Sequence, residues 1–298
     1  TARLCEIARP TIGIITNIGP DHLEFFGTME VSAQAKAEML DLLPPDGVAI
    51  LNADDSYYDY LAARARCRVV SFGFSSKADV RATDLKPDGR NGTTFRLLLP
   101  GTVRRTMVHI RVQGDHNVPN ALAAGAVGSI LGLPGGVIAQ GLSRFRPAAM
   151  RSQVRVSQGV KLIIDCYNAN PDSMTAAVRL LAQTGAKRKK IAVLGDMLEL
   201  GPNAAQMHEE VGGFVARHGI DRLVACGPLG RNLAKGAKQA GLDPSHILEV
   251  PDARAAAAAV KTVVKPGDAV LIKASRGMKL ELVADALQGA KRTTKKAS

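Results

Sequence analysis

The chain has 298 residues, of which 46% are hydrophobic and 22% charged; this composition excludes disordered and fibrous proteins and leaves room for about two globular domains. Its 39 basic and 27 acidic residues give a net charge of +12, but many of the basic residues gather at 187–190 and 291–296, and there is no Trp. A solvated turn and a basic tail explain that pattern better than a nucleic-acid surface, which would need stacking aromatics.

The first half of the chain mixes strands and helices. A strand is predicted at 12–16, and because the chain opens with Thr1 so close to it, we expect a fragment that begins inside a fold. A helix near 32–43 and a strand at 48–52 follow. Hairpin dipeptides at 88–89 and 91–92 give residues 79–112 β character. Helices are then predicted at 117–131 and 135–143.

The second half has a regular rhythm in which short apolar runs alternate with helical patterns, which predicts βαβ units and a mostly parallel, Rossmann-like sheet. The segment from Phe145 to Met150 interrupts the pattern, so we place domains at 1–149 and 150–290, with a basic tail at 291–298. Ala255–Ala259 is expected to be helical. The runs are 161–165, 191–195, 223–227 and 269–273.

Three of these runs end in polar loops, which begin at Asp165, Asp196 and Ala274. If the strands are parallel, the loops share one edge of the sheet, where α/β proteins bind ligands. Each loop also has a structural explanation: Asn170 before Pro171 is a good helix start, and Asp165 can accept backbone hydrogen bonds. Three such loops together favour a site.

Two candidates lie in the first half. His22 follows the opening strand and is a potential metal ligand or general base, although a lone loop histidine is more often solvated. Lys36 precedes Met39 and Leu40 and therefore belongs to the apolar helix face, where it either extends its amine to the surface or becomes a desolvated nucleophile. Asn117 and Asn120 either cap the next helix or present amides to a purine.

Four widely spaced cysteines, without a Cys-x-x-Cys pair, predict reduced thiols rather than a disulfide framework or a zinc site. No apolar run approaches the roughly 18 residues of a membrane span, and no leader pattern opens the chain, so we expect a cytoplasmic protein. Neither Gly-x-x-x-x-Gly-Lys-[Ser/Thr] nor Gly-x-Gly-x-x-Gly after a strand occurs in the sequence.

Six segments in this order resemble the Mur ligase family, and within it the members that add D-alanyl-D-alanine to a UDP-linked muramoyl tripeptide. The resemblance extends from about residue 2 to 288 and implies an α/β fold: the remainder of a central ATPase domain, then a Rossmann-like C-terminal domain. Ala274 stands where the family usually has glycine. The segments are NIGPDHLE at 17–24, AKAE at 35–38, GDHNVPNA at 114–121, DCYNANPDSM at 165–174, LGDMLELG at 194–201 with His208, and KASRGMK at 273–279.

The resemblance also implies ATP-dependent amide-bond formation through an acyl phosphate. His22 would bind Mg²⁺ and Lys36 would be carbamylated, which turns a cation into a metal-binding anion. The remaining roles are nucleotide and substrate contacts. Asn117 and Asn120 would meet adenine, Arg151 phosphate, and Asp165 and Tyr167 the nucleotide from the C-terminal domain, helping to close the domains; Asp196, Met197, Ser275 and Arg276 would face the dipeptide.

Two alternatives stay open: a related ligase that adds another amino acid, and a non-catalytic nucleotide-binding module. Neither requires a nucleic-acid partner or a membrane span, and a monomer is expected. We predict that the 298-residue chain alone neither hydrolyses ATP nor forms the amide, because its sequence offers no phosphate loop to enclose the β and γ phosphates. Phosphate release above the buffer background from purified chain with ATP and both substrates would contradict this.

Overall fold

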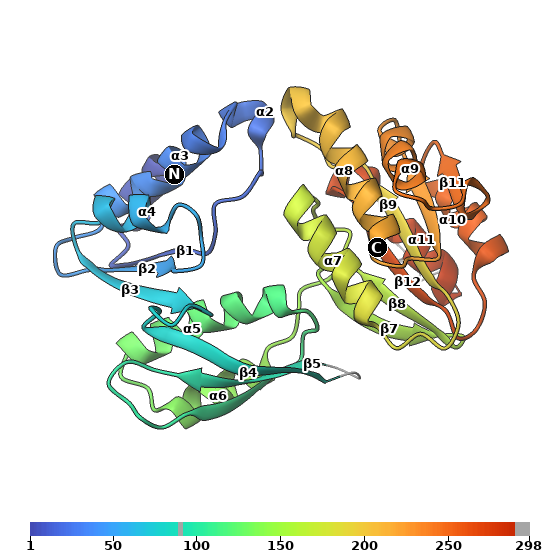
Figure 1. Cartoon of the computed structure of the whole chain (residues 1–298). Coiled ribbons are helices and arrows are strands. Elements are labelled where there is room, and N and C mark those ends of the chain that lie inside the picture. The colour runs from blue at the N-terminus through green and yellow to red at the C-terminus, as the bar shows by residue number, and fades with distance from the viewer. Residues whose placement is uncertain (89–91, 290–298) are drawn as a thin grey trace, which may run out of the picture. The chain divides into compact units, whose positions relative to one another are not determined.

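The computed structural model describes residues 1–88 and 92–289 (Figure 1). It divides into two compact units between Arg146 and Pro147. The predicted tail at 291–298 lies outside the described residues, as do positions 89 and 91 of the expected hairpin dipeptides. Within the described part of the chain, no helix combines the length and apolar character needed to cross a membrane.

Unit 1 is built on a six-stranded sheet in the order β1-β2-β3-β4-β5-β6. The first four strands run parallel, and β5 and β6 add antiparallel neighbours. The expected β character of 79–112 is therefore confirmed, as a meander attached to a parallel sheet. The strands are β1 (Ile12–Ile15), β2 (Val48–Asn52), β3 (Arg68–Gly73), β4 (Val80–Asp88), β5 (Gly92–Leu98) and β6 (Thr106–Ile110).

The helices of unit 1 cover both faces of this sheet. On one face, α3 and α4 bury Ala37, Leu40 and Leu61 against β1 and β2. On the other, α5 and α6 bury Leu122 and Ile138 against β2–β6. The helices are α1 (Ala2–Ala8), α2 (Leu23–Phe26), α3 (Met29–Asp41), α4 (Tyr58–Arg64), α5 (Val118–Ile130) and α6 (Gly135–Arg144), with a 3₁₀ turn at Asp115–Asn117.

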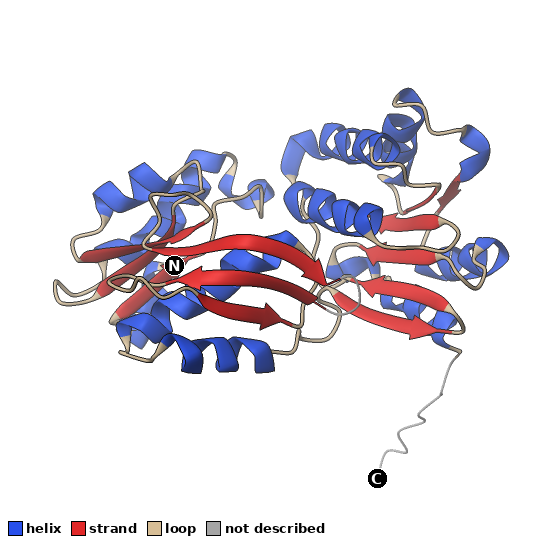
Figure 2. Cartoon of the chain, turned by 60° about the horizontal axis from the view of Figure 1, so that its bottom comes forward, coloured by secondary structure: helices blue, strands red, loops and turns tan. Residues whose placement is uncertain are grey.

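Unit 2 contains a second six-stranded sheet, in the order β11-β10-β9-β12-β8-β7. Strands are drawn in red in Figure 2. All neighbours are parallel except β7 and β8, so the predicted, mostly parallel sheet is confirmed. The two strands that the sequence did not indicate, β7 and β11, are the edge strands of the sheet. The strands are β7 (Gln153–Ser157), β8 (Val160–Ile164), β9 (Lys190–Gly195), β10 (Arg222–Cys226), β11 (Ile247–Val250) and β12 (Ala269–Lys273).

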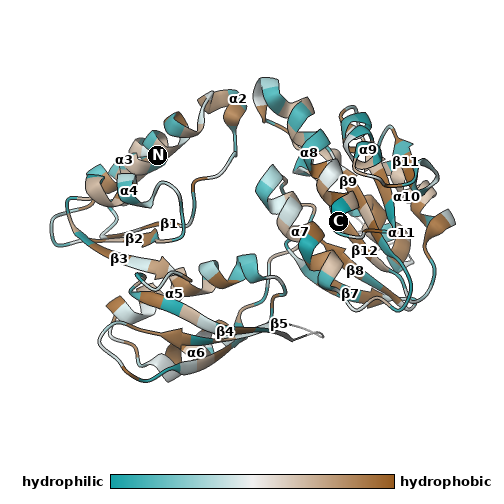
Figure 3. Cartoon of the chain, viewed as in Figure 1, coloured by the Kyte–Doolittle hydropathy of each residue, from teal (hydrophilic) through white to brown (hydrophobic). Residues whose placement is uncertain are grey.

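Helices also cover both faces of the unit 2 sheet, whose strands are strongly hydrophobic (Figure 3). The helices α7, α8 and α9 pack on one face, and α10 and α11 pack on the other. Such two-sided burial explains the continuous apolar runs in the sequence. The helices are α7 (Pro171–Gln183), α8 (Ala204–Arg217), α9 (Gly230–Gln239), α10 (Ala253–Val263) and α11 (Glu281–Gln288), with 3₁₀ turns at Gly201–Asn203, Pro244–His246 and Arg276–Met278.

Local sequence signals set several of these boundaries. Asn170 accepts a hydrogen bond from the Ser173 backbone N–H at 2.7 Å, the Ser173 hydroxyl completes a capping box, and Pro171 opens α7, as the sequence predicts. The first-half helix expected near 32–43 begins instead at Met29, because the Thr28 side chain accepts from the Val31 N–H. All four cysteines are free thiols, as expected.

Candidate functional site

The polar loops that follow β8, β9 and β12 meet at one edge of the unit 2 sheet. These strands are parallel and adjacent in the order β9-β12-β8, so their carboxyl ends coincide. Hydrogen bonds join the loops directly: the Leu198 N–H donates to Ser275 Oγ at 2.9 Å, and the Ser275 N–H donates to the Asp196 carbonyl at 3.1 Å. The prediction that the three loops share one edge is confirmed.

Asp165, the first residue after β8, has defined partners for both carboxylate oxygens. Its Oδ2 accepts from Lys273 Nζ at 2.7 Å, and its Oδ1 accepts from the Ser152 backbone N–H at 2.8 Å. The Lys273 side chain is only 2% exposed, and Nζ also donates to the Asn168 carbonyl at 2.9 Å. A buried ion pair with further hydrogen bonds satisfies both charges.

Arg151 lies beside Tyr167, the second residue after Asp165 in sequence. The Arg151 guanidinium stacks on the Tyr167 ring at 4.0 Å from its centroid, an attractive cation–π geometry. Both residues remain exposed, Tyr167 at 44%. The structure therefore brings Arg151, Asp165 and Tyr167, three of the sequence-predicted nucleotide contacts, into one cluster on unit 2.

The backbone that carries Arg151 is in an unusual conformation. Met150 and Ser152, which flank Arg151, have φ values of 61° and 45°, in the left-handed region that non-glycine residues rarely adopt. Two hydrogen bonds hold this segment to the loop after β8: Ser152 N–H to Asp165, and Tyr167 N–H to the Met150 carbonyl at 3.2 Å. Strained residues persist where the surroundings fix them, and such residues cluster at functional sites.

The predicted substrate residues Asp196 and Met197 are buried, at 3% and 1% exposed. Asp196 Oδ1 accepts from the Leu229 N–H at 3.1 Å, and the Met197 N–H donates to Nε2 of buried His208 at 2.9 Å. Burial raises the pKa of Asp196 to about 6, opposed by the bond from Leu229. Burial also lowers the pKa of His208.

The raised pKa of Asp196 predicts that its charge costs stability at neutral pH. The raised pKa means that the folded protein binds the Asp196 proton more tightly than the unfolded chain does. The stability that protonated Asp196 contributes is therefore fully present below pH 4 and is lost as pH rises through 6. Two pKa units correspond to about 3 kcal/mol. Asp196→Asn should therefore raise the free energy of unfolding by about 1–3 kcal/mol at pH 8.

Urea unfolding followed by circular dichroism measures this change, and the same comparison at pH 4 should show little gain. Asp285→Asn, at an exposed position on α11, is the matched control and should change stability little at either pH. An equal gain for Asp196→Asn at both values would show that removal of the charge is not the cause.

Ser275 and Arg276 differ in exposure. Ser275 is 4% exposed, and its hydroxyl ties together the loops after β8 and β9. Arg276 is exposed, and its Nη1 donates to Glu281 Oε1 at 2.7 Å and to the Met150 sulfur at 3.4 Å. Of the four predicted dipeptide contacts, Arg276 alone presents its side chain to solvent.

In unit 1, the loop that leaves the carboxyl end of β1 leads to His22. This loop is anchored by the Ile18 N–H, which donates to Asp55 Oδ2 at 2.6 Å, and by Asn52 Nδ2, which donates to the Thr16 carbonyl at 3.0 Å. His22 is exposed and is the N-cap residue that precedes α2, with φ 58°. Lys36 is half-buried on α3, beside buried Ala33, Ala37 and Leu40.

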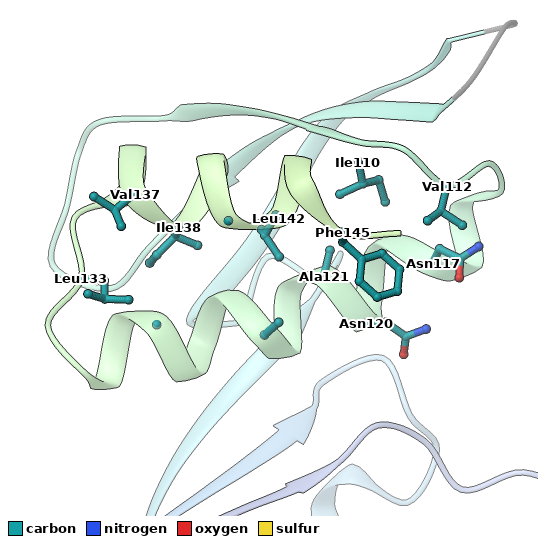
Figure 4. A pocket seen from close by; sticks show the side chains of 13 residues that line it. Ile110, Val112, Asn117, Asn120, Ala121, Leu133, Val137, Ile138, Leu142 and Phe145 are labelled. Carbon is teal, nitrogen blue, oxygen red and sulfur yellow. The ribbon is translucent and has the colours of Figure 1, made fainter. Parts of the chain in front are cut away.

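Asn117 and Asn120 line a cavity of about 530 Å³ between α5, α6 and the end of β6 (Figure 4). The sequence left a capping role open for them. Asn117 makes no side-chain cap to α5, and its Nδ2 donates instead to the Gln113 carbonyl at 2.9 Å. The two amides lie near Phe145 at one end of an otherwise apolar cavity. The lining residues are Ile110, Val112, Asn117, Asn120, Ala121, Ala124, Gly128, Leu133, Val137, Ile138, Gly141, Leu142 and Phe145.

Within residues 1–88 and 92–289, no three His, Cys, Asp or Glu side chains gather closely enough to hold a metal ion. Sequence reasoning also missed two parts of the site. The sequence places Lys273 at the end of a predicted strand and in the KASRGMK segment without giving it a role, although a lysine that ends a buried apolar run is a signal for a paired charge. The cavity between α5 and α6 depends on how these two consecutive helices pack, which residue types and spacing do not give.

Comparison with known proteins agrees with this architecture. Residues 1–128 match the Mur ligase middle domain, and residues 150–276 match the Mur ligase, glutamate ligase domain. A UDP-N-acetylmuramoyl-tripeptide--D-alanyl-D-alanine ligase of Mycobacterium tuberculosis is 38% identical over 96% of this chain, which spans 59% of that relative's length.

Two solved structures are also similar. The crystal structure of MurF from Acinetobacter baumannii superposes with a TM-score of 0.84 at 30% identity, covering 95% of this chain and 60% of that one. The MurF ligase from Thermotoga maritima in complex with ADP gives a TM-score of 0.82 at 26% identity, covering 96% and 64%.

Proposed function

Because the chain belongs to the Mur ligase family, we propose that it supplies the nucleotide- and amine-binding parts of an ATP-dependent ligase of peptidoglycan synthesis. The proposed reaction joins D-alanyl-D-alanine to UDP-N-acetylmuramoyl-tripeptide in the cytoplasm. The observation that carries this proposal is the 38% identity, across 96% of the chain, to a ligase so named. The ADP complex of a similar structure supports ATP as the energy source.

In this reaction the tripeptide carboxylate attacks the γ-phosphorus of ATP, which gives an acyl phosphate and ADP. The amine of the dipeptide then attacks the acyl carbon, and the tetrahedral intermediate collapses with loss of phosphate and a proton. Most of the catalysis in such a sequence comes from positioning and charge neutralisation. The protein must therefore hold a nucleotide, an acid and an amine in fixed register.

For unit 1, we propose that the cavity beside Asn117 and Asn120 receives the adenine. Its walls are almost entirely apolar, and the two amides provide donors and acceptors at one end. A flat base with polar edges fits such a lining, since apolar walls bind its faces and amides read its edge.

For unit 2, the exposed Arg151 guanidinium fits a phosphate, and stacking on Tyr167 restricts its rotamers. Asp165 pairs with Lys273 through Oδ2, and this oxygen keeps a further lone pair. We propose that this carboxylate accepts a hydrogen bond from a ribose hydroxyl.

For Mg²⁺, we propose His22 and a carbamylated Lys36 as protein ligands. Mg²⁺ prefers oxygen donors and keeps several waters, so it needs only one or two protein groups. The exposed His22 and the half-buried Lys36 both leave access for an ion, and the carbamate would add oxygen donors. When bound, the ion would neutralise phosphate charge.

The loops after β9 and β12 are proposed to face the dipeptide. Buried Asp196, Met197 and Ser275 would fix the shape of these loops, whereas exposed Arg276 would contact the dipeptide carboxylate. Its pairing with Glu281 uses one Nη1 donor, and a guanidinium has five N–H donors.

The test is an amine screen on a completed enzyme, defined as this chain joined to the part of the M. tuberculosis ligase that it does not cover. Phosphate release should require ATP, UDP-N-acetylmuramoyl-tripeptide and D-alanyl-D-alanine together. A preference for a single amino acid would favour a related ligase, and ATP binding without turnover of any amine would favour a non-catalytic module.

A further inference from the structure

We propose that Lys273 is a positioning residue that holds the Arg151 segment and the Asp165 loop in their binding conformation. The inference rests on the proposed nucleotide role of Arg151, Asp165 and Tyr167, and it assigns to Lys273 a function beyond filling the end of a strand. Lys273 is the last residue of β12, which lies between β9 and β8 in the sheet.

The Lys273 ammonium connects two points of the loop after β8. Nζ donates to Asp165 Oδ2 at 2.7 Å and to the Asn168 carbonyl at 2.9 Å. Tyr167 lies between these anchors in sequence, so one cation fixes both sides of the residue on which Arg151 stacks. At 2% exposure the ammonium has little contact with water, and leaving these bonds would cost the full desolvation of a charge.

The positional effect continues from Asp165 to Arg151. Asp165 Oδ1 accepts from the Ser152 N–H at 2.8 Å, and Ser152, like Met150, has a positive φ. Left-handed conformations of non-glycine residues are unfavourable on their own. The Arg151 backbone therefore depends on Asp165, whose carboxylate depends in turn on Lys273.

A second route explains why a lysine fits this position. The Met150 carbonyl accepts from the Tyr167 N–H at 3.2 Å, so a shift of the Asp165–Asn168 loop would displace Met150 as well as Ser152. The positions of Met150 and Ser152, the two neighbours of Arg151, thus both depend on the Lys273 ammonium. A neutral side chain of similar length would fill the space but would leave Asp165 and Asn168 without their common donor.

The first experiment measures ADP binding to the 298-residue chain by titration calorimetry. Lys273→Met should raise the Kd for ADP at least about tenfold, because mispositioned contacts lose most of their contribution. Lys261→Met, which makes the same chemical change at an exposed position on α10, should leave the Kd unchanged. An unaltered Kd in Lys273→Met would overturn the proposal.

A second readout follows the segment without nucleotide. The chain has no Trp, so Tyr167→Trp creates a single fluorescent reporter. In that background Lys273→Met should increase acrylamide quenching, and Lys261→Met should not. If the parent chain fails to bind ADP while quenching still rises, the proposed nucleotide role fails and the positioning role stands. Unchanged quenching would contradict the positioning role.

A further variant covers the case in which Lys273→Met does not fold because Asp165 is left unpaired. Asp165→Asn combined with Lys273→Met removes both charges together and keeps an amide oxygen for the Ser152 N–H. This double variant should bind ADP more weakly, and be quenched more strongly, than Asp165→Asn alone. Equal behaviour of the two would show that Lys273 positions nothing beyond its partner.

Discussion

Lys36→Ala should abolish nearly all turnover of the completed enzyme while its unfolding midpoint changes little. Lys36 is half-buried on α3, so its loss leaves no large cavity in the core. If its amine carries a carbamate, the substitution removes the anion that would hold Mg²⁺ beside the phosphates. Losses of about a thousandfold are typical when such an electrostatic group is removed.

Small carboxylic acids should separate this chemical role from a packing role. Formate or acetate supplied in solution should restore part of the activity of Lys36→Ala, because either anion can replace the missing oxygen donors. Lys36→Arg should not be active, since arginine stays cationic. Gln34→Ala, at an exposed position on the same helix, is the control and should keep full activity.

Near-normal kcat in Lys36→Ala would contradict the carbamate hypothesis and leave Lys36 as a lysine that extends its amine to solvent. Removal of bicarbonate at a pH where carbamates are labile provides an independent test. Unchanged activity under that condition would count against the hypothesis in the same way.

Asp165→Ala should raise the KM for ATP of the completed enzyme about tenfold or more, the loss expected for a charged hydrogen bond of about 1.5–3 kcal/mol. The structure adds a second effect. The substitution leaves the Lys273 ammonium buried without its carboxylate, and breaking a buried pair in this way costs about 3–5 kcal/mol of stability.

Asp165→Asn separates the two effects, because the amide oxygen can still accept from Ser152 while the charge is lost. Steady-state kinetics at varied ATP, together with urea unfolding, gives both quantities for each variant. A normal KM with reduced stability would reduce Asp165 to a structural partner of Lys273 and Ser152. A raised KM in both variants would support the ribose contact.

Much of the architecture could be predicted from the sequence because strands of a parallel sheet that is covered on both faces consist of continuous apolar runs. The runs at 161–165, 191–195, 223–227 and 269–273 each fall on a strand of unit 2 to within a residue or so. The start of helix α7 could also be predicted, since it combines an Asn cap with Pro at the first helical position. The edge strands β7 and β11 pair on one side only, and their half-exposed patterns do not differ from those of loops.

The geometry of the candidate site was only partly predictable. The sequence predicted that the polar loops after β8, β9 and β12 share one edge, as the strand order confirms, whereas burial of Asp196, Met197 and Ser275 could not be inferred from residue type. The Lys273 bonds in the cluster join residues more than 100 positions apart, as between Lys273 and Asp165. The motif identified the strand, and only the fold supplied the partner.

The loop after β9 has a consequence for how the protein tolerates acid. His208 accepts from the Met197 N–H through Nε2 and bonds to the Ala204 carbonyl through Nδ1, so it must be neutral with its proton on Nδ1. Burial lowers its pKa; the unfolded chain therefore binds that proton more readily, and stability falls as pH drops below about 6.5. Neighbouring Asp196 has the opposite linkage, with a pKa raised to about 6. As pH falls from about 6 toward 4, the proton that Asp196 retains on folding opposes the effect of the proton that His208 gives up. The two groups therefore have opposing effects on how the free energy of unfolding changes with pH. Substitution of either residue would leave the pH dependence caused by the other uncompensated.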